Sequence, residues 1–376
     1  MRLSFLDPLY AAEGPVASVC LDTSRDIDDP DRAIELRWRH AREKLAAEGA
    51  DRATLSALGG GVGADRDVDG PHGQALFAAD GQVLLAQELP RPPERDTARY
   101  SRLPDAMPLA VQRAPDISYL AVVISREGPA DAGPGAGPSG EADSVVASLQ
   151  AGRWPASTVA PQPVSSYAMP AAQWQQGAVR VTEAAERAVR DHGSEVIVVW
   201  AQQGDPWPRG VFVNRLPPEL HERVITVDGE EPPRAAPGRA LLEQDLANLL
   251  DGRLGDRDRT HFDRYLAQRS RHRASCEGMA AAVRALQRGQ VQALFVNDQP
   301  GPSPARLWTG PEPTHIALSA EELEAFGAPA VAQEPADALL IRAAAHTGAE
   351  LVVVPYEELA LDDGVGALLR YTTPAP

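Results

Sequence analysis

Apolar residues gather along this chain into short runs, and amphipathic stretches separate these runs. The runs of strand length are residues 16–22, 117–125, 195–200, 223–227, 291–296 and 351–354. Such runs are typical of strands that are covered on both faces of a sheet. Between them, apolar positions spaced three or four residues apart predict helices. The alternation of the two patterns predicts an α/β fold.

The first part of the chain has a mixed α+β pattern. Residues 3–12 predict a helix, and a second helix starts at Pro30. Residues 74–85 contain two apolar stretches around Asp-Gly, which is typical of a hairpin. Residues 59–63 are rich in glycine and predict a flexible break. Further helices are predicted at residues 177–192, 239–250, 257–288 and 336–346.

These elements predict three domains, which span residues 1–114, 115–232 and 238–376. The clearest linker is residues 230–238, where acidic residues, proline and glycine replace the apolar pattern. Residues 128–140 are rich in glycine, proline and alanine, and they predict a loop inside the second domain.

Composition narrows the classes of function. The chain has 376 residues and a formal net charge of −17, which argues against binding nucleic acid over its whole surface, and no DNA partner is expected. It contains no apolar stretch of transmembrane length and no signal-peptide pattern, so we expect no membrane and a cytoplasmic location. Cys20 and Cys276 lie far apart and predict neither a disulfide framework nor a metal site.

Two basic stretches stand out against the acidic background. The first, residues 32–44, supplies the rRNA-binding candidates Arg37, Arg39, Arg42 and Lys44. The second, residues 253–273, supplies the partner-binding candidates Arg264, Arg269, Arg271 and Arg273. Guanidinium groups could neutralise RNA phosphates, and Trp38 could stack on bases. The alternative is a solvated helix face with ion pairs, in which Trp38 belongs to the apolar stripe.

Patterns typical of catalysis or metal binding are absent from the sequence. The eight histidines show no metal-ligand spacing, and the glycines of residues 59–63 lack the Gly-Lys-Ser/Thr of a phosphate loop. No Gly-x-Ser-x-Gly elbow is present, and no cofactor is expected. Two Gln-Gln-Gly runs occur, at residues 202–204 and within the loop candidates Trp174, Gln175, Gln176 and Gly177. A helix start and a turn after a strand explain both runs.

The end of the chain joins a Gly-apolar-Gly turn to a short strand pattern. Gly364 and Gly366 allow a positive φ or a close approach of another chain segment. The apolar residues then enter a sheet, and the pattern ends at Arg370 and Tyr371.

Together with the helix and strand of residues 336–354, this ending resembles the close of the third domain of archaeal and eukaryotic peptide-chain release factors and their relative Pelota. Residues 11–24 and 281–296 add two looser similarities. The chain thus resembles the bacterial branch of the archaeo-eukaryotic release factor family, notably the actinobacterial group related to the hibernation factor Balon.

The resemblance implies a role for each predicted domain. The first corresponds to the domain that faces the decoding site, and the second to the domain that reaches toward the peptidyl-transferase centre. The third corresponds to a ribosomal-protein-like α/β/α sandwich that docks an elongation-type GTPase. Release factors carry Gly-Gly-Gln in the second domain, and this chain has no such tripeptide. The resemblance therefore implies a non-catalytic factor that binds the ribosomal A site in hibernation or stress.

Two alternatives stay open. A peptidyl-tRNA hydrolase or a tRNA-acting ribosome-rescue enzyme would need a polar residue on a loop of the second domain, such as Gln175 or Gln176. A scaffold or regulatory protein would keep the fold without ribosome binding, and the net charge of −17 favours it because ribosomal RNA repels an acidic surface. The sequence favours a non-catalytic protein over an enzyme.

Overall fold

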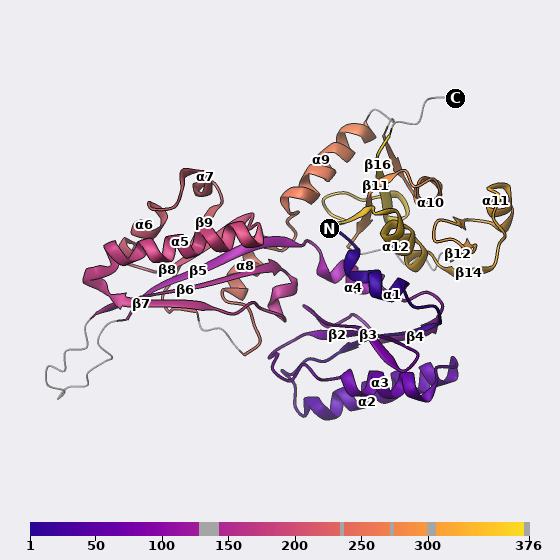
Figure 1. The fold of residues 1–376 in the computed structure, drawn as a ribbon, viewed down its shortest axis with the longest axis horizontal. Coiled ribbons are helices and arrows are strands. Elements are labelled where there is room, and N and C mark those ends of the chain that lie inside the picture. The colour runs from indigo at the N-terminus through magenta and orange to yellow at the C-terminus, as the bar shows by residue number, and fades with distance from the viewer. Residues whose placement is uncertain (128–142, 234–236, 271–273, 299–305, 372–376) are drawn as a thin grey trace. The chain divides into compact units, whose positions relative to one another are not determined.

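The computed structural model describes residues 1–127, 143–233, 237–270, 274–298 and 306–371 (Figure 1). The chain divides into two compact units. Unit 1 combines residues 1–115 with residues 256–376, and unit 2 comprises residues 116–255. Each unit contains helices packed on sheets, so the predicted α/β class is confirmed. No helix in the described ranges is both long and apolar enough to cross a membrane.

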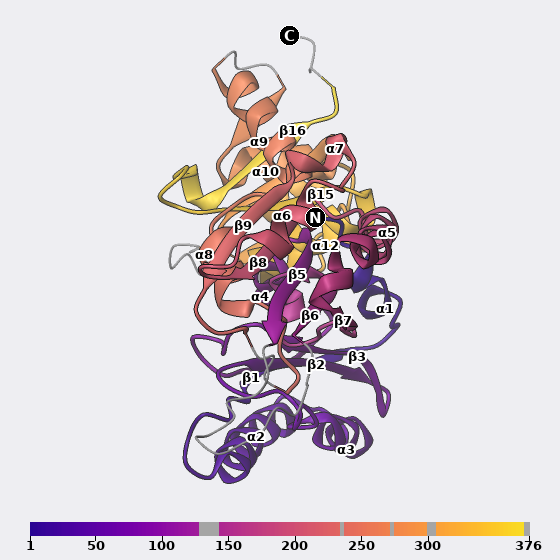
Figure 2. The ribbon, with the colours of Figure 1, turned by 90° about the vertical axis from the view of Figure 1, so that its left-hand side faces the viewer.

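The first part of unit 1 is a four-stranded antiparallel sheet in the order β3-β2-β1-β4. Its strands are β1 (Val16–Asp22), β2 (Gly73–Ala79), β3 (Gln82–Leu89) and β4 (Thr97–Ser101). Two helices, α2 (Pro30–Ala47) and α3 (Arg52–Gly61), lie side by side on one face (Figure 1, Figure 2). Along β1 the side chains alternate, so that Val19 packs under these helices and Cys20 enters the core on the other face.

The last part of unit 1 is a mixed sheet in the order β10-β16-β11-β15. Its strands are β10 (Ser275–Glu277), β11 (Val291–Asn297), β15 (Glu350–Val354) and β16 (Val365–Leu369). Its main helices are α9 (Asp256–Arg269), α10 (Met279–Gln287) and α12 (Ala336–Thr347). Between β11 and α12 the chain forms a small module of β12 (Arg306–Thr309), β13 (Ile316–Ala317), α11 (Ala320–Ala325) and β14 (Ala332–Pro335).

One hydrophobic core joins the two parts of unit 1. It also takes in α1 (Asp7–Tyr10) and α4 (Met107–Arg113). Buried members from both parts are Leu6, Leu9, Phe77, Leu109, Leu286, Leu294, Leu339 and Leu351. Polar contacts add to this core: the amino group of Met1 donates to Asp258 at 3.0 Å, and Arg99 pairs with Glu334 at 2.6 Å. The first and last segments of the chain are therefore held together in one unit.

Unit 2 is a five-stranded sheet in the order β7-β6-β5-β8-β9. Its strands are β5 (Ile117–Glu127), β6 (Ser144–Trp154), β7 (Ser165–Pro170), β8 (Val196–Gln202) and β9 (Val224–Gly229). β5, β8 and β9 are parallel to one another, whereas β6 and β7 are antiparallel. One face is covered by α5 (Trp174–His192), α6 (Trp207–Val213) and α7 (Pro218–His221), and the other by α8 (Glu243–Leu250).

The structure differs from the sequence-based expectations at three places. Residues 59–61 form the end of α3 and are no flexible break. The helical stretch expected at residues 257–288 is interrupted by β10, which pairs with β16. Residues 239–250 lie in unit 2, because Leu246 and Leu250 of α8 pack on its sheet. The loop expected at residues 128–140 lies outside the described residues. The division into three domains stays a prediction.

Candidate nucleic-acid interface

Helix α2 carries the first group of candidates, and its sequence explains how it is placed. Asp29 caps its first turn by accepting a hydrogen bond from the backbone of Arg32, and Pro30 occupies the first helical position. Ile34, Ala41 and Leu45 form the buried stripe. Trp38 packs against the same core, so the apolar-stripe interpretation of this tryptophan holds. Its indole is therefore no free platform for a base.

The four rRNA-binding candidates on α2 do not share one role. Arg37 is half-buried, and its guanidinium pairs with Asp22 at 2.8 Å and with Asp96 at 3.5 Å. Arg37 therefore connects α2 to the end of β1, and its charge is already paired within the protein. Arg39, Arg42 and Lys44 are exposed.

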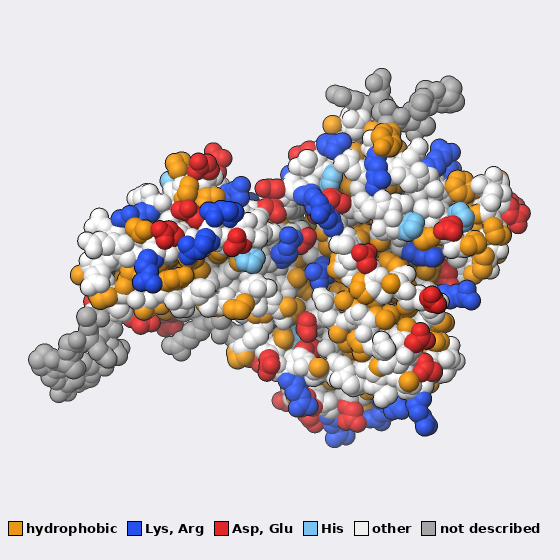
Figure 3. All heavy atoms as spheres, viewed as in Figure 1, with side chains coloured by type: hydrophobic (Ala, Val, Ile, Leu, Met, Phe, Trp, Pro, Cys, Tyr) orange, Lys and Arg blue, Asp and Glu red, His pale blue; other side chains and the backbone are white. Residues whose placement is uncertain are grey.

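The three exposed candidates do not lie on one face of the helix. With about 100° per residue, Arg39 and Arg42 lie roughly 60° apart on one side of the buried stripe. Lys44 lies on its other side. Figure 3 shows Lys and Arg side chains gathered over α2 and α3, with acidic side chains among them. The usable basic surface is therefore Arg39 and Arg42, with Arg32 two turns earlier on the same side.

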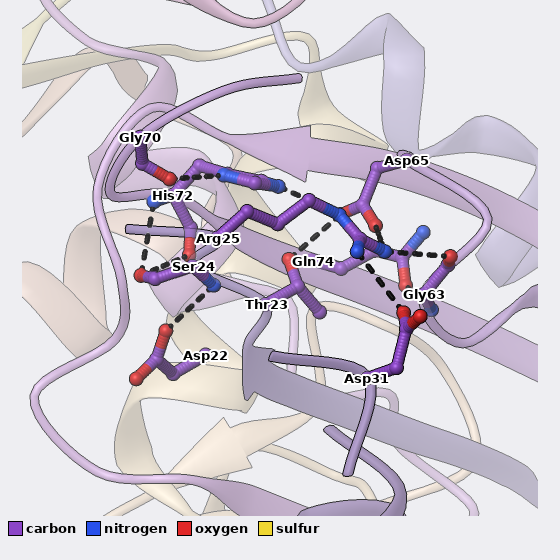
Figure 4. A network of polar contacts seen from close by, with 10 residues as sticks. All are labelled: Asp22, Thr23, Ser24, Arg25, Asp31, Gly63, Asp65, Gly70, His72 and Gln74. Carbon is purple, nitrogen blue, oxygen red and sulfur yellow. Dashed lines mark hydrogen bonds and ion pairs between the residues drawn. The ribbon is translucent and has the colours of Figure 1, made fainter. Parts of the chain in front are cut away.

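A buried polar network connects the loop before α2 to the loop before β2 (Figure 4). Its centre is Asp65, whose carboxylate accepts a hydrogen bond from the Thr23 hydroxyl at 2.7 Å. His72 Nε2 lies 3.2 Å from the same oxygen, and both side chains are fully buried. Burial acts to raise the pKa of Asp65, but hydrogen bonds from His72 and Thr23 outweigh it and hold the pKa below its ordinary value.

Arg25 extends this network toward α2 (Figure 4). Its guanidinium reaches Asp31 at 3.0 Å and the Gly63 carbonyl oxygen at 3.3 Å, and it lies 4.0 Å from Asp65. The backbone of Arg25 also donates to Gly70 at 3.1 Å, which continues the pairing of β1 with β2 beyond the strands. The network therefore clamps the loop before α2 to the loop before β2.

The order of groups in this network points to a structural role. Asp65 is central, with the Thr23 hydroxyl donating to it and His72 Nε2 lying 3.2 Å from the same oxygen, whereas a nucleophile would need its hydroxyl to face the imidazole base. The second ring nitrogen of His72 faces the Gly70 carbonyl oxygen at 2.9 Å. In the sequence, His72 is one of several scattered histidines. The one sequence feature that pointed to this network was Leu-Asp-Thr-Ser at residues 21–24, which belongs to a loose similarity to the family.

The middle candidates lie in the first turn of α5 and not in a loop. Trp174 is fully buried, and its indole donates to the Pro208 carbonyl oxygen at 2.9 Å. Gln175 and Gln176 are exposed. An added Cβ at Gly177 would lie 2.1 Å from the sulfur of Met169, so a larger residue here would displace that side chain.

The second Gln-Gln-Gly run lies at the same edge of the sheet. β5 and β8 are parallel, so residues 202–204 follow β8 at the edge where β5 ends. β7 reaches this edge too, since Pro170 pairs with Ser144 at the start of β6, and α5 follows directly. Arg126 pairs there with Asp143 and, at 3.2 Å, with Asp205. The sequence did not predict that the two runs converge, because the convergence depends on strand order. Among the described residues of this edge there is no histidine or cysteine to serve as a base or nucleophile.

Three arginines of the second basic stretch form ion pairs within unit 1. Arg269 of α9 forms two hydrogen bonds to Glu277, at 2.7 and 2.9 Å. Its neighbours on α9 behave alike: Arg257 pairs with Glu350 at 3.4 Å and Arg259 with Glu358 at 2.9 Å. Arg264 is exposed, and Arg271 and Arg273 lie outside the described residues.

The C-terminal motif supports the sheet of unit 1. Gly364 has a φ of 71°, and a Cβ at Gly366 would lie 2.7 Å from the hydroxyl oxygen of Tyr265. Arg370 donates to the Thr347 carbonyl oxygen at 2.7 Å, which ties the end of β16 to α12. Tyr371 is 71% exposed and contributes little to this packing.

The middle of the chain matches a known protein family. Residues 118–271 match the family model of bacterial archaeo-eukaryotic release factor family 2. The resemblance to this family is therefore confirmed. The matched stretch covers nearly all of unit 2 and α9.

Relatives and solved structures extend over more of the chain. Uncharacterized protein Rv2629 of Mycobacterium tuberculosis strain ATCC 25618 / H37Rv is 28% identical over 386 residues, covering 99% of this chain and 97% of that protein. Pelota of Archaeoglobus fulgidus is 14% identical, with 81% of each chain covered and a TM-score of 0.36. A chain in a model of ribosome-bound archaeal Pelota and ABCE1 is 11% identical, with 99% and 94% covered and a TM-score of 0.38.

Proposed function

We propose that this protein is a non-catalytic translation factor that binds the ribosomal A site in the cytoplasm, in hibernation or stress. The observation that carries the proposal is the exposed pair Arg39 and Arg42 on α2. Neither guanidinium has a hydrogen-bond or ion-pair partner within the described residues. They belong to a chain whose middle matches a release factor family. Free arginines on a rigid helix are suited to contact RNA phosphates.

The middle unit supports a non-catalytic role. The chain has no Gly-Gly-Gln, and the nearest sequence, Gln175-Gln176-Gly177, is fixed in a helical turn. Gly177 packs against the side chain of Met169 in this turn. The last part of unit 1 would dock an elongation-type GTPase, with Arg264 as an exposed candidate. This assignment extends the family resemblance to that part of the chain.

Salt-dependent co-sedimentation with purified ribosomes tests the proposal. Binding should weaken as salt rises, because each phosphate contact releases counterions. Arg39→Ala/Arg42→Ala should weaken binding and lower the slope of log Kd against log salt by about one per lost contact. Arg284→Ala/Arg288→Ala is the matched control, since it removes two exposed arginines from α10 and the turn after it. Absence from the ribosome pellet at low salt, or equal binding by both variants, would refute the proposal.

A ribosome-rescue hydrolase is the second candidate, and the convergence of both Gln-Gln-Gly runs at one edge of unit 2 favours it. Exposed glutamine amides can donate hydrogen bonds to a carbonyl oxygen or orient a water molecule. Purified protein would be added to stalled ribosome–nascent-chain complexes, and peptide release measured. Release that Gln176→Ala abolishes would establish this function in place of the non-catalytic one.

A further inference from the structure

The small module between β11 and α12 has very little core of its own. Its cluster consists of Ala317, Leu323 and Ala328, against which Trp308 and Ala330 pack. The module is anchored to the first sheet of unit 1 by the ion pair of Arg99 with Glu334 at 2.6 Å. It nevertheless leaves large apolar side chains in solvent.

Three apolar side chains of this module are exposed: Leu318 by 40%, Phe326 by 44% and Val331 by 59%. The ring of Phe326 lies 6.2 Å from the ring of His315. His315 accepts a backbone hydrogen bond from Gly310, and the backbone of Val331 donates to Thr309 at 2.8 Å. Phe326 and Val331 therefore border the same turn after β12. Figure 3 shows hydrophobic side chains over α11 with acidic side chains beside them.

The module is strongly acidic. Residues 306–335 contain Glu312, Glu321, Glu322, Glu324 and Glu334, and their one basic residue is Arg306. Glu334 is neutralised by Arg99, and Glu322 accepts a backbone hydrogen bond from Leu318. Glu312, Glu321 and Glu324 stay exposed around the apolar side chains. We call these three glutamates, with Leu318, Phe326 and Val331, the α11 patch.

We propose that the α11 patch docks a protein segment that presents apolar side chains flanked by lysine or arginine. Apolar side chains exposed together and rimmed by charge mark interaction surfaces, and Phe326 and Val331 supply the anchors. These three glutamates form no ion pair within the described residues. Their charge selects a basic partner and repels nucleic acid, whose phosphates carry the same sign of charge. Docking at the α11 patch does not require ribosome binding, because its apolar side chains are exposed in the chain alone.

The test uses the full chain and a fluorescently labelled amphipathic helical peptide of leucine and lysine. Its counterpart carries glutamate in place of lysine on the same leucine face. The lysine peptide should bind at least about tenfold more tightly in an anisotropy titration. Phe326→Ser/Val331→Ser should weaken its binding about fivefold or more. Both residues are exposed, so circular dichroism should show an unchanged fold.

A charge-reversal pair separates the patch from the general acidity of the chain. Glu321→Lys/Glu324→Lys should weaken binding of the lysine peptide by a similar factor. The control, Glu183→Lys/Glu222→Lys, makes the same change in net charge on unit 2 and should leave binding within about twofold. A photo-crosslinking version of the peptide should label residues 306–335. No binding, equal loss in both charge variants, or labelling elsewhere would overturn the proposal.

Discussion

Replacing Gly366 with alanine should destabilise the C-terminal sheet of unit 1. Gly366 lies in β16, which pairs with β10 and β11. An added Cβ would lie 2.7 Å from the hydroxyl oxygen of Tyr265 and 3.2 Å from a methyl carbon of Leu361. Tyr265 is fully buried, and its ring centroid lies 4.6 Å from that of Phe295, so it has little room to turn away. Overpacking of this kind costs about 1–3 kcal/mol.

A double-mutant cycle identifies the clash as the cause. The hydroxyl of Tyr265 is buried and has no hydrogen-bond partner within the described residues. Burial also raises the pKa of this hydroxyl, so it stays protonated at neutral pH. Tyr265→Phe should therefore be nearly neutral alone, because it removes an unsatisfied polar group. In the Phe background Gly366→Ala should lose its closest contact, which gives a coupling energy of about 1 kcal/mol.

Hydrogen exchange followed by mass spectrometry measures the effect where it arises. Amides of β16 and β11 should exchange roughly 5- to 150-fold faster in Gly366→Ala, which corresponds to about 1–3 kcal/mol. Gly60→Ala is the control, because no atom lies within 4 Å of its added Cβ and its position in α3 favours alanine. Unchanged exchange in Gly366→Ala, or a double mutant no better protected than the single one, would refute the clash.

Three further predictions concern buried and half-buried groups. Trp174→Phe should lower the free energy of unfolding of unit 2 by about 1–3 kcal/mol in urea titrations, because an indole hydrogen bond and buried volume are lost. The control is Trp207→Phe: Trp207 is 43% exposed, so its replacement should change the free energy of unfolding by under about 0.5 kcal/mol. The folded-state pKa of Asp65 lies below its ordinary value, so its ionised form adds stability at neutral pH that is lost as pH falls through that pKa. Asp65→Asn should accordingly show a flatter fall in melting temperature than the wild type below about pH 4. Burial raises the pKa of the Cys20 thiol to about 12 and that of Cys276 to about 11. Because the thiolate is the reactive form, both thiols of the native protein should resist alkylation by iodoacetamide at pH 8, and both should react after denaturation.

Much of the fold could be predicted from apolar runs. The runs at residues 117–125, 195–200 and 291–296 became the central strands β5, β8 and β11. They could be identified because a strand covered on both faces must be apolar at nearly every position. The hairpin of β2 and β3 was likewise marked by its Asp-Gly turn.

Strands and boundaries that depend on distant partners could not be predicted. β4 (Thr97–Ser101) is largely polar, and it is a strand because it pairs with β1. α8 (Glu243–Leu250) follows the apparent linker, so the sequence assigned it to the last domain. Its side chains instead fill the open face of β5 and β8. Local pattern carries no information on which sheet a helix covers.

The candidate site shows the same limit at the level of single side chains. The sequence grouped Arg37 with Arg39 and Arg42, because charge and helical spacing do not reveal an ion pair. Its partner Asp96 comes from a loop far along the chain. Arg269 was grouped with exposed arginines for the same reason, although Glu277 holds it. Ion pairing therefore decides which arginines remain available.

The shared core of unit 1 has a consequence for how the protein is made. Residues 116–255 leave the ribosome as an uninterrupted stretch and can fold while synthesis continues. The first sheet must wait, with Phe77 of β2 and Leu9 of α1 still lacking part of their core, until α10 and α12 have been translated. The middle of the polypeptide should therefore mature before its beginning, and a nascent chain arrested before residue 256 should be a substrate for chaperones.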